Sequence, residues 1–242
     1  MTGFTLIVFG AIGFSEKKYD EKTLTDVSVE IENQYDNYFL DEMEIKASLQ
    51  TAVSGEFIGS SLRDLNLRAM ELKLGHHKFV EVAQVFHDPK GNLTIRLYQS
   101  RPIARLLRPE KPDAYIGSEG QILPTSEDFT ARVMVIGGPF VHTLAQNDLG
   151  TTHQGRSYLE LLHFIEADPF LKAQIAQMQV DKNGEIIMYP QLSKQYVEFG
   201  MPTQIEEKFK KMMIFYQQIL PDKGWNTYEK VNLKYENQII CE

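Results

Sequence analysis

The chain has almost no cysteine. Its 242 residues contain one, Cys241, so an intrachain disulfide is impossible and a structural metal site built from several thiolates is excluded. Stability must come from a packed core, and 43% of the residues are hydrophobic, which is enough to form one. The length allows one large domain or two of ordinary size.

Positive charge is also scarce. The 25 Lys and Arg residues are outnumbered by 33 Asp and Glu, which gives a formal net charge of −8, and the basic residues do not gather into a cluster. Nonspecific nucleic-acid binding depends on neutralising phosphates with Lys and Arg. We therefore expect no nucleic-acid partner.

Long hydrophobic runs are missing, and the longest apolar run lies at the start, Phe4–Phe14. At ~1.5 Å per helical residue it covers about half of a ~30 Å hydrocarbon layer, and the mixed charges of Ser15–Lys22 follow it. We interpret it as the outer half of a single membrane anchor whose beginning lies outside this sequence. The alternative is a buried strand or helix; a signal peptide would have a basic region before the run and a cleavage pattern after it. The side chains expected in the membrane are Phe4, Leu6, Ile7, Val8, Phe9, Ile12 and Phe14.

Recognisable catalytic motifs are absent too. The sequence contains no Gly-x-Gly-x-x-Gly, P-loop or Gly-x-Ser-x-Gly pattern. Glu160 and His163 have the spacing of a di-iron ligand pair, but it occurs once, and Ser15 and Lys18 form a Ser-x-x-Lys pattern without its companion motifs. We expect no catalytic, cofactor-binding or metal-binding residues, and no enzyme.

The first hundred residues predict the order β-α-α-β-β. Alternating apolar residues in Leu24–Glu32 predict a half-buried strand, and Asp41 and Ser61 are each followed by an acidic residue three positions later, which predicts two helix starts. The second helix should end at Gly75. Two apolar strands then flank the turn-forming segment Asp88–Asn92, which predicts a hairpin.

The rest of the chain predicts a larger mixed α+β domain. Short strands lie between prolines, and helices are expected to begin at Ser157, Asp168 and Thr203, the last one extending to Leu220. Alternation in Tyr228–Ile240 predicts a final long strand. We therefore divide the chain into residues 1–22 (anchor and tether), 23–101 (first domain) and 102–242 (second domain).

Several blocks occur in an order that resembles a known family. They are Arg101–Ala104, Ala114–Ile116, Glu119–Pro124, Val133–Gly138, Tyr158–Glu166, Gly184–Ile187, Ile205–Leu220 and Val231–Ile240. This order resembles the FtsQ/DivIB family of bacterial cell-division proteins, and the preceding β-α-α-β-β module resembles a POTRA domain. The expected fold is therefore α+β: a POTRA module followed by a larger domain with a mostly antiparallel curved sheet and terminal helices.

The resemblance implies a scaffold of the divisome, the bacterial cell-division assembly. Such proteins lie in the cytoplasmic membrane as single-pass proteins, with both domains in the periplasm and enriched at the septum. They bind FtsB-like and FtsL-like single-span coiled-coil proteins and link early and late division proteins to septal peptidoglycan synthesis; the POTRA module can bind further partners. In the family, the last strands of the second domain accept a strand from FtsB.

The C-terminal residues support such a role on their own. A terminal strand with alternating faces is typical of a sheet edge, whose unpaired backbone groups can accept a partner strand. We predict that Val231–Glu236 provides this strand and that Trp225 and Tyr228 are aromatic anchors. The predicted partner-binding residues are Trp225, Tyr228, Val231, Asn232, Leu233, Lys234, Tyr235 and Glu236. The alternative is an edge strand kept soluble by its charges.

Two other functions stay open at this point. One is a POTRA-containing accessory of outer-membrane assembly or secretion, which would need a barrel or further POTRA repeats. The other is an extracytoplasmic cell-wall enzyme whose polar cluster the spacing of residues does not reveal.

Overall fold

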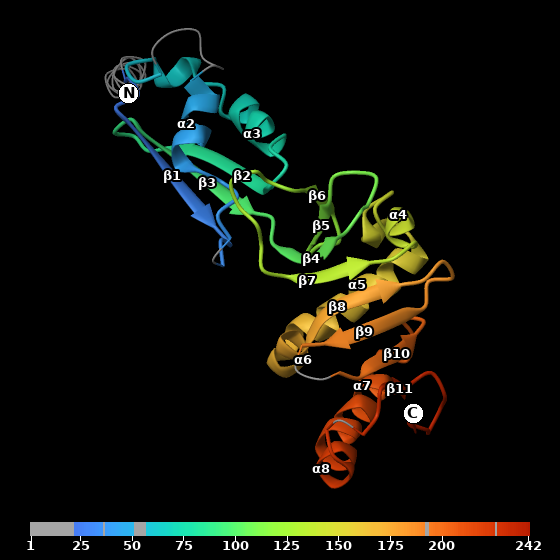
Figure 1. Cartoon of the computed structure of the whole chain (residues 1–242). Helices are drawn as coiled ribbons and strands as arrows, with labels where there is room; N and C mark the ends of the chain where they lie inside the picture. Colours follow the sequence, from blue (N-terminus) through green and yellow to red (C-terminus); the bar gives the residue numbers. More distant parts are fainter. Residues whose placement is uncertain (1–21, 36, 51–56, 192–193, 226) are drawn as a thin grey trace, which may run out of the picture. The chain divides into compact units, whose positions relative to one another are not determined.

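The computed structural model describes residues 22–35, 37–50, 57–191, 194–225 and 227–242. The chain divides into two compact units, Met1–Ser100 and Arg101–Glu242 (Figure 1). The expected membrane anchor, Phe4–Phe14, lies outside the described residues. Among the helices that the structure does describe, none combines the length and hydropathy needed to cross a bilayer.

In its described residues, the first unit contains a three-stranded sheet, two α-helices and a short 3₁₀ helix. Strand β1 pairs in parallel with β3, which pairs antiparallel with β2, so the sheet order is β1-β3-β2. The predicted β-α-α-β-β order is therefore confirmed. Its elements are β1 (Asp26–Glu32), α2 (Glu42–Gln50), η1 (Leu62–Asp64), α3 (Leu67–Gly75), β2 (Val80–His87) and β3 (Asn92–Gln99).

The helices cover the apolar face of this sheet. Strand β1 alternates between exposed and half-buried residues, because its Val27, Val29 and Ile31 align with the fully buried positions of β3. Helix α2 packs beside β1 and α3 beside β2 (Figure 1). The buried residues that meet there are Ile45, Leu49, Met70, Leu74, Leu93, Ile95 and Leu97.

One of the two predicted helix starts in this unit is confirmed. The Asp41 carboxylate accepts hydrogen bonds from two backbone N–H groups of the first turn of α2, as an N-cap does. The start at Ser61 was wrong. Ser61 caps only the short 3₁₀ turn η1, because the backbone at Leu65 is extended and leaves the helical region. Helix α3 begins later, where the Asn66 side chain accepts the N–H of Ala69.

The second unit contains a nine-stranded mixed sheet of order β12-β11-β10-β9-β8-β7-β4-β5-β6. Antiparallel pairings outnumber parallel ones, so the predicted α+β class with a mostly antiparallel sheet is confirmed. Its strands are β4 (Pro102–Leu106), β5 (Ala114–Gly117), β6 (Ile122–Pro124), β7 (Met134–Gly137), β8 (Ile175–Val180), β9 (Ile186–Pro190), β10 (Tyr196–Gly200), β11 (Lys230–Asn232) and β12 (Ile240–Cys241). Its helices are α4 (Val141–Leu144), η2 (Leu149–Thr151), α5 (His153–Ala167), α6 (Pro169–Gln174), α7 (Ile205–Ile214), η3 (Phe215–Ile219) and α8 (Leu220–Lys223).

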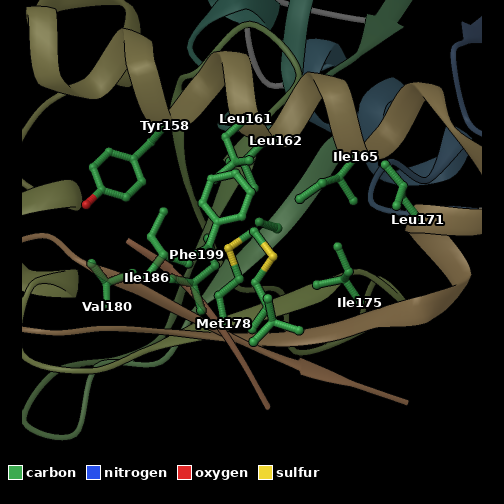
Figure 2. Close-up of a cluster of buried hydrophobic side chains, with 14 of the residues drawn as sticks. Tyr158, Leu161, Leu162, Ile165, Leu171, Ile175, Met178, Val180, Ile186 and Phe199 are labelled. Atoms are coloured by element: carbon green, nitrogen blue, oxygen red, sulfur yellow. The ribbon is translucent and has the colours of Figure 1, made fainter. Parts of the chain in front are cut away.

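The core of this unit lies between α5 and the middle of the sheet. Figure 2 shows side chains of α5 pointing toward side chains that rise from β8, β9 and β10. Each fully buried side chain of this size contributes about 1.5–3 kcal/mol relative to an exposed one. The labelled members with at most 2% exposure are Tyr158, Leu161, Leu162, Ile165, Leu171, Ile175, Met178, Val180, Ile186 and Phe199.

Helix α5 begins earlier than the sequence pattern predicted. The start at Ser157 was wrong: the helix begins at His153, where the Thr152 hydroxyl accepts the N–H of Gly155 at 2.9 Å. The apolar stripe starts only at Tyr158, so the polar first turn carried no hydrophobic periodicity. The start at Asp168 is confirmed, because its carboxylate accepts two backbone N–H groups of α6.

The predicted helix from Thr203 to Leu220 is present in three consecutive parts. It begins at Ile205, and Thr203 does not cap it, because Gln204 at the N-cap is in the left-handed region with φ 52°. The middle part, η3, is a π-helix that ends at Ile219, two residues before Pro221. In a regular α-helix the proline ring would clash with the carbonyl of the preceding turn, and the wider π-turn is consistent with relief of that clash.

The predicted long C-terminal strand was wrong. Strand β11 ends at Asn232, whose side-chain oxygen accepts the N–H of Lys234 at 2.9 Å and so forms a local turn that competes with sheet pairing. The chain then turns, with Asn237 at φ 54°, and returns as the short strand β12. Apolar alternation alone did not reveal this reversal.

Candidate partner-binding edge

The sequence predicted that Val231–Glu236 forms the edge of the sheet, and this prediction was wrong. Strand β11 lies inside the sheet. It pairs in parallel with β10 on one side and antiparallel with β12 on the other, and Val231 is aligned with both Val197 and Cys241. Within the described sheet, β12 is the outer strand at this end. Any partner strand that extends the sheet here would therefore lie next to β12.

The outward backbone groups of β12 follow from its register. Lys230 and Glu242 exchange two hydrogen bonds, with N···O distances of 3.0 Å each, so they form a hydrogen-bonded antiparallel pair. Residues opposite each other alternate between bonded and non-bonded pairs along such a ladder. The N–H and C=O groups of Cys241 therefore point away from β11, toward the open side of the sheet.

Three of the predicted partner-binding side chains are buried. Val231 and Leu233 are 0% exposed and pack in the core, and Asn232 is 7% exposed and donates a hydrogen bond to Glu198 at 2.7 Å. In the folded chain these side chains are not accessible to a partner. Their role at the edge is to fix β11, on which β12 lies.

The aromatic residues differ in accessibility. Trp225 and Tyr235 are about half exposed, at 53% and 54%. Tyr228 is partly buried, and the centroid of its ring lies 6.2 Å from that of Phe215. Ile239 and Cys241 also pack at the margin of this core. The edge thus presents a partly buried apolar margin and two more exposed aromatic rings.

Charged side chains link the final strands. Lys230 lies 2.9 Å from the carboxylate of Glu242 and 3.9 Å from that of Glu198, and Lys234 contacts Glu198 and Glu185 at 3.7 and 3.3 Å. The hydrogen bond that Lys230 donates to the Glu242 carboxylate raises the pKa of Lys230. Burial acts to lower the pKa of Lys234, but the hydrogen bond that it donates to Glu185, together with the negative charges of Glu185 and Glu198, raises this pKa overall. These lysines therefore remain charged at neutral pH.

The other charged residue predicted here, Glu236, is exposed and accepts a hydrogen bond from Gln204 at 3.2 Å.

Two buried lysines were missed by the sequence analysis. Lys208 and Lys211 are 4% and 8% exposed and lie one turn apart on α7. The ammonium of Lys208 donates to the carbonyl of Met201 at 2.7 Å and lies 4.8 Å from the ring centroid of Phe199. The sequence did contain a signal for them, because both lysines interrupt the apolar stripe of the helix. A charged residue on a buried helix face needs polar partners.

Lys211 is bound to the segment that follows β11. Its ammonium donates to the carbonyls of Leu233 and Tyr235, both at 2.7 Å. Hydrogen bonds from a charged donor are stronger than neutral ones, and they satisfy the buried charge. Helix α7 is thereby connected to the turn that leads into β12.

Of the two motifs considered for catalysis, the Glu160–His163 pair lies among the described residues. His163 contacts the backbone carbonyl of Ser118, with a ring nitrogen 2.7 Å from the oxygen. In the part of the chain that the structure describes, no three His, Cys, Asp or Glu side chains are grouped as metal ligands would be. The Ser15–Lys18 pattern lies outside the described residues.

Comparison with known proteins agrees with this two-part architecture. Residues 22–98 match the POTRA-like domain, and residues 101–242 match the family described as FtsQ/DivIB, C-terminal related. These matches define a POTRA-containing protein with an FtsQ-type second domain. A similar protein is the cell division protein FtsQ of Rhodothermus marinus, 23% identical over 186 residues, which cover 75% of this chain and 67% of the relative. The chain belongs to the FtsQ/DivIB family of bacterial cell-division proteins, as the resemblance had predicted.

Proposed function

We propose that this protein is a membrane-anchored scaffold of the bacterial divisome that binds a partner strand along β12. The observation that carries the proposal is the outward orientation of the Cys241 backbone groups at the end of the sheet. A strand added there gains main-chain hydrogen bonds, and its alternating side chains provide selectivity. The proposed role is non-enzymatic and needs no cofactor.

The side chains around β12 suggest how a partner strand is selected. On the core side, Ile239, Cys241 and Tyr228 offer partly buried apolar surface, so apolar partner residues on that face would extend the core. Burial raises the pKa of the Cys241 thiol, which therefore stays neutral and compatible with such contacts. Trp225 and Tyr235 are candidate aromatic anchors because their rings are already exposed.

Membership in the family supports the choice of partner and location. The proposed partners are FtsB-like and FtsL-like single-span proteins, and further division proteins at the POTRA module, in the service of septal peptidoglycan synthesis. We assign residues 1–22 to the anchor and tether, 23–101 to the POTRA domain and 102–242 to the partner-binding domain. The segment Phe4–Phe14 would hold the protein in the cytoplasmic membrane, with both domains in the periplasm at the septum.

Replacing Cys241 by proline tests the proposal. Proline removes the outward N–H and places its ring on the open side of β12, but it leaves the bonds between Lys230 and Glu242 in place. We expect the full chain to bind the periplasmic part of an FtsB-like protein at least about 10-fold more weakly, measured by titration calorimetry, because a backbone hydrogen bond is lost and a strand cannot approach.

The matched control is Cys241→Ala, which removes the same thiol but keeps the N–H. This variant should bind within about two- to three-fold of the unchanged chain, since a single partly buried thiol contributes little. Both variants should retain the thermal unfolding midpoint. Binding by the folded Cys241→Pro protein at unchanged affinity would show that β12 is not the docking edge.

A further inference from the structure

The position of β12 depends on few contacts of its own. The strand comprises Ile240 and Cys241, and its neighbour Glu242 makes the flanking backbone bonds to Lys230 and Glu229. Two-stranded pairing of such short segments is marginal unless other parts of the fold hold the strands together. The turn between β11 and β12, residues 233–239, must therefore be fixed by something outside the hairpin.

Lys211 provides contacts that fix this turn. Its two hydrogen bonds reach carbonyls on either side of Lys234, so they restrain the chain where it leaves β11. The charge is buried, and in the described part of the chain its partners are backbone carbonyls rather than a carboxylate. A buried ammonium is costly to desolvate and is not the usual choice for core stability. Three donors on one group, however, can hold two carbonyls at the same time.

The neighbouring lysine has a different target. Lys208 donates to the carbonyl of Met201, which precedes α7, and not to the turn 233–239. A further contact to the turn, from Gln204 to Glu236, is exposed. Lys211 thus makes a buried, hydrogen-bonded link between α7 and this turn.

We propose that Lys211 is a positioning residue for the partner-binding edge: by holding the carbonyls of Leu233 and Tyr235 it sets where β12 lies on β11. The relevance to partner binding rests on the proposed function, but the positioning itself is a property of the chain without a partner. In this respect Lys211 differs from the residues that would touch the partner. It also differs from the apolar residues of α7, which stabilise the whole unit.

Lys211→Met separates positioning from general stability. Methionine removes the ammonium and leaves both carbonyls without their bonds, while it keeps an apolar side chain in the core. We expect the amide of Glu242, measured by hydrogen exchange in the free full-length chain, to exchange at least about 10-fold faster. The amides of Val197 on β10 and Met188 on β9 should be unchanged, because those strands are held by their own ladders.

Two matched variants complete the experiment. Lys211→Arg keeps a charged donor and should restore most of the protection at Glu242. Lys210→Met removes the adjacent exposed lysine, which pairs with Glu206, and should change nothing in β12. Unchanged exchange at Glu242 in Lys211→Met would overturn the inference, as would an equal acceleration at Val197 and Met188. Neither outcome requires a partner, so a failure here is distinct from failure of the Cys241→Pro binding test.

Discussion

Replacement of Val231 by aspartate is expected to unfold the second unit, not merely to weaken partner binding. Val231 is 0% exposed and is paired between Val197 and Cys241 in the interior of the sheet. Aspartate at this position would bury an unpaired carboxylate and remove two methyl groups from the core. Changes of this type cost more than about 4 kcal/mol, which is a large part of the stability of a typical domain.

Denaturant unfolding followed by circular dichroism would measure this effect. The matched control is Tyr235→Asp, which introduces the same charge at a predicted partner-binding position that is 54% exposed. This control should change the free energy of unfolding by at most about 0.5 kcal/mol. Equal stability of the two variants would mean that Val231 is accessible and that β11 does not lie inside the sheet.

Replacement of Lys208 by methionine is expected to stabilise the protein at neutral pH. Burial, and secondarily the charge of Lys211, lowers the pKa of Lys208 from 10.5 to about 8, against the opposite influence of Glu185 and Glu207. This lowering corresponds to about 3 kcal/mol. Loss of the hydrogen bond to Met201 offsets about 1 kcal/mol of the gain. The net expectation is an increase in the free energy of unfolding of about 1–2 kcal/mol.

The pH dependence tests this explanation directly. Below about pH 8 the lysine is charged in both the folded and the unfolded chain, and the folded state carries the full cost of its burial. Between about pH 8 and 10.5 the folded chain has lost the proton and the unfolded chain has kept it, so the contribution of Lys208 to stability rises with pH. The difference between the unchanged protein and Lys208→Met should therefore shrink across this range. A constant difference from pH 7 to 10 would contradict the assigned pKa.

The order of strands and helices in the first unit could be predicted from the sequence, because hydrophobic periodicity and turn-forming residues are local signals. The POTRA-like module was predicted from the alternation in β1, the Asp41 cap and the hairpin turn at Asp88. Helix starts were missed where the first turn was polar, as at Thr152, or where an extended residue interrupted the expected helix, as at Leu65. Such boundaries depend on backbone conformations that hydrophobic patterning does not encode.

The proposed partner-binding edge could be predicted only in part. The region was identified correctly as the last strands of a sheet, but which strand is outermost depends on a chain reversal set by Asn232 and Asn237. Whether Val231 faces solvent or the core likewise depends on pairing with strands far away in the sequence. The role of Lys211 was not predictable for the same reason, since its acceptors are backbone carbonyls that carry no sequence signature.

The order of strands in the second unit has a consequence for how the domain folds. From β8 to β12, each strand pairs with the strand that comes just before it in the chain, and β5 and β6 do the same on the other side of β4, while β7 pairs with β4. The five antiparallel pairings close short stretches of chain, which favours rapid folding, whereas the three parallel pairings (β4–β7, β7–β8 and β10–β11) enclose longer segments. The β4–β7 pair is the point where these two runs of strands meet, and a docking polypeptide at β12 would extend the second run by one more strand.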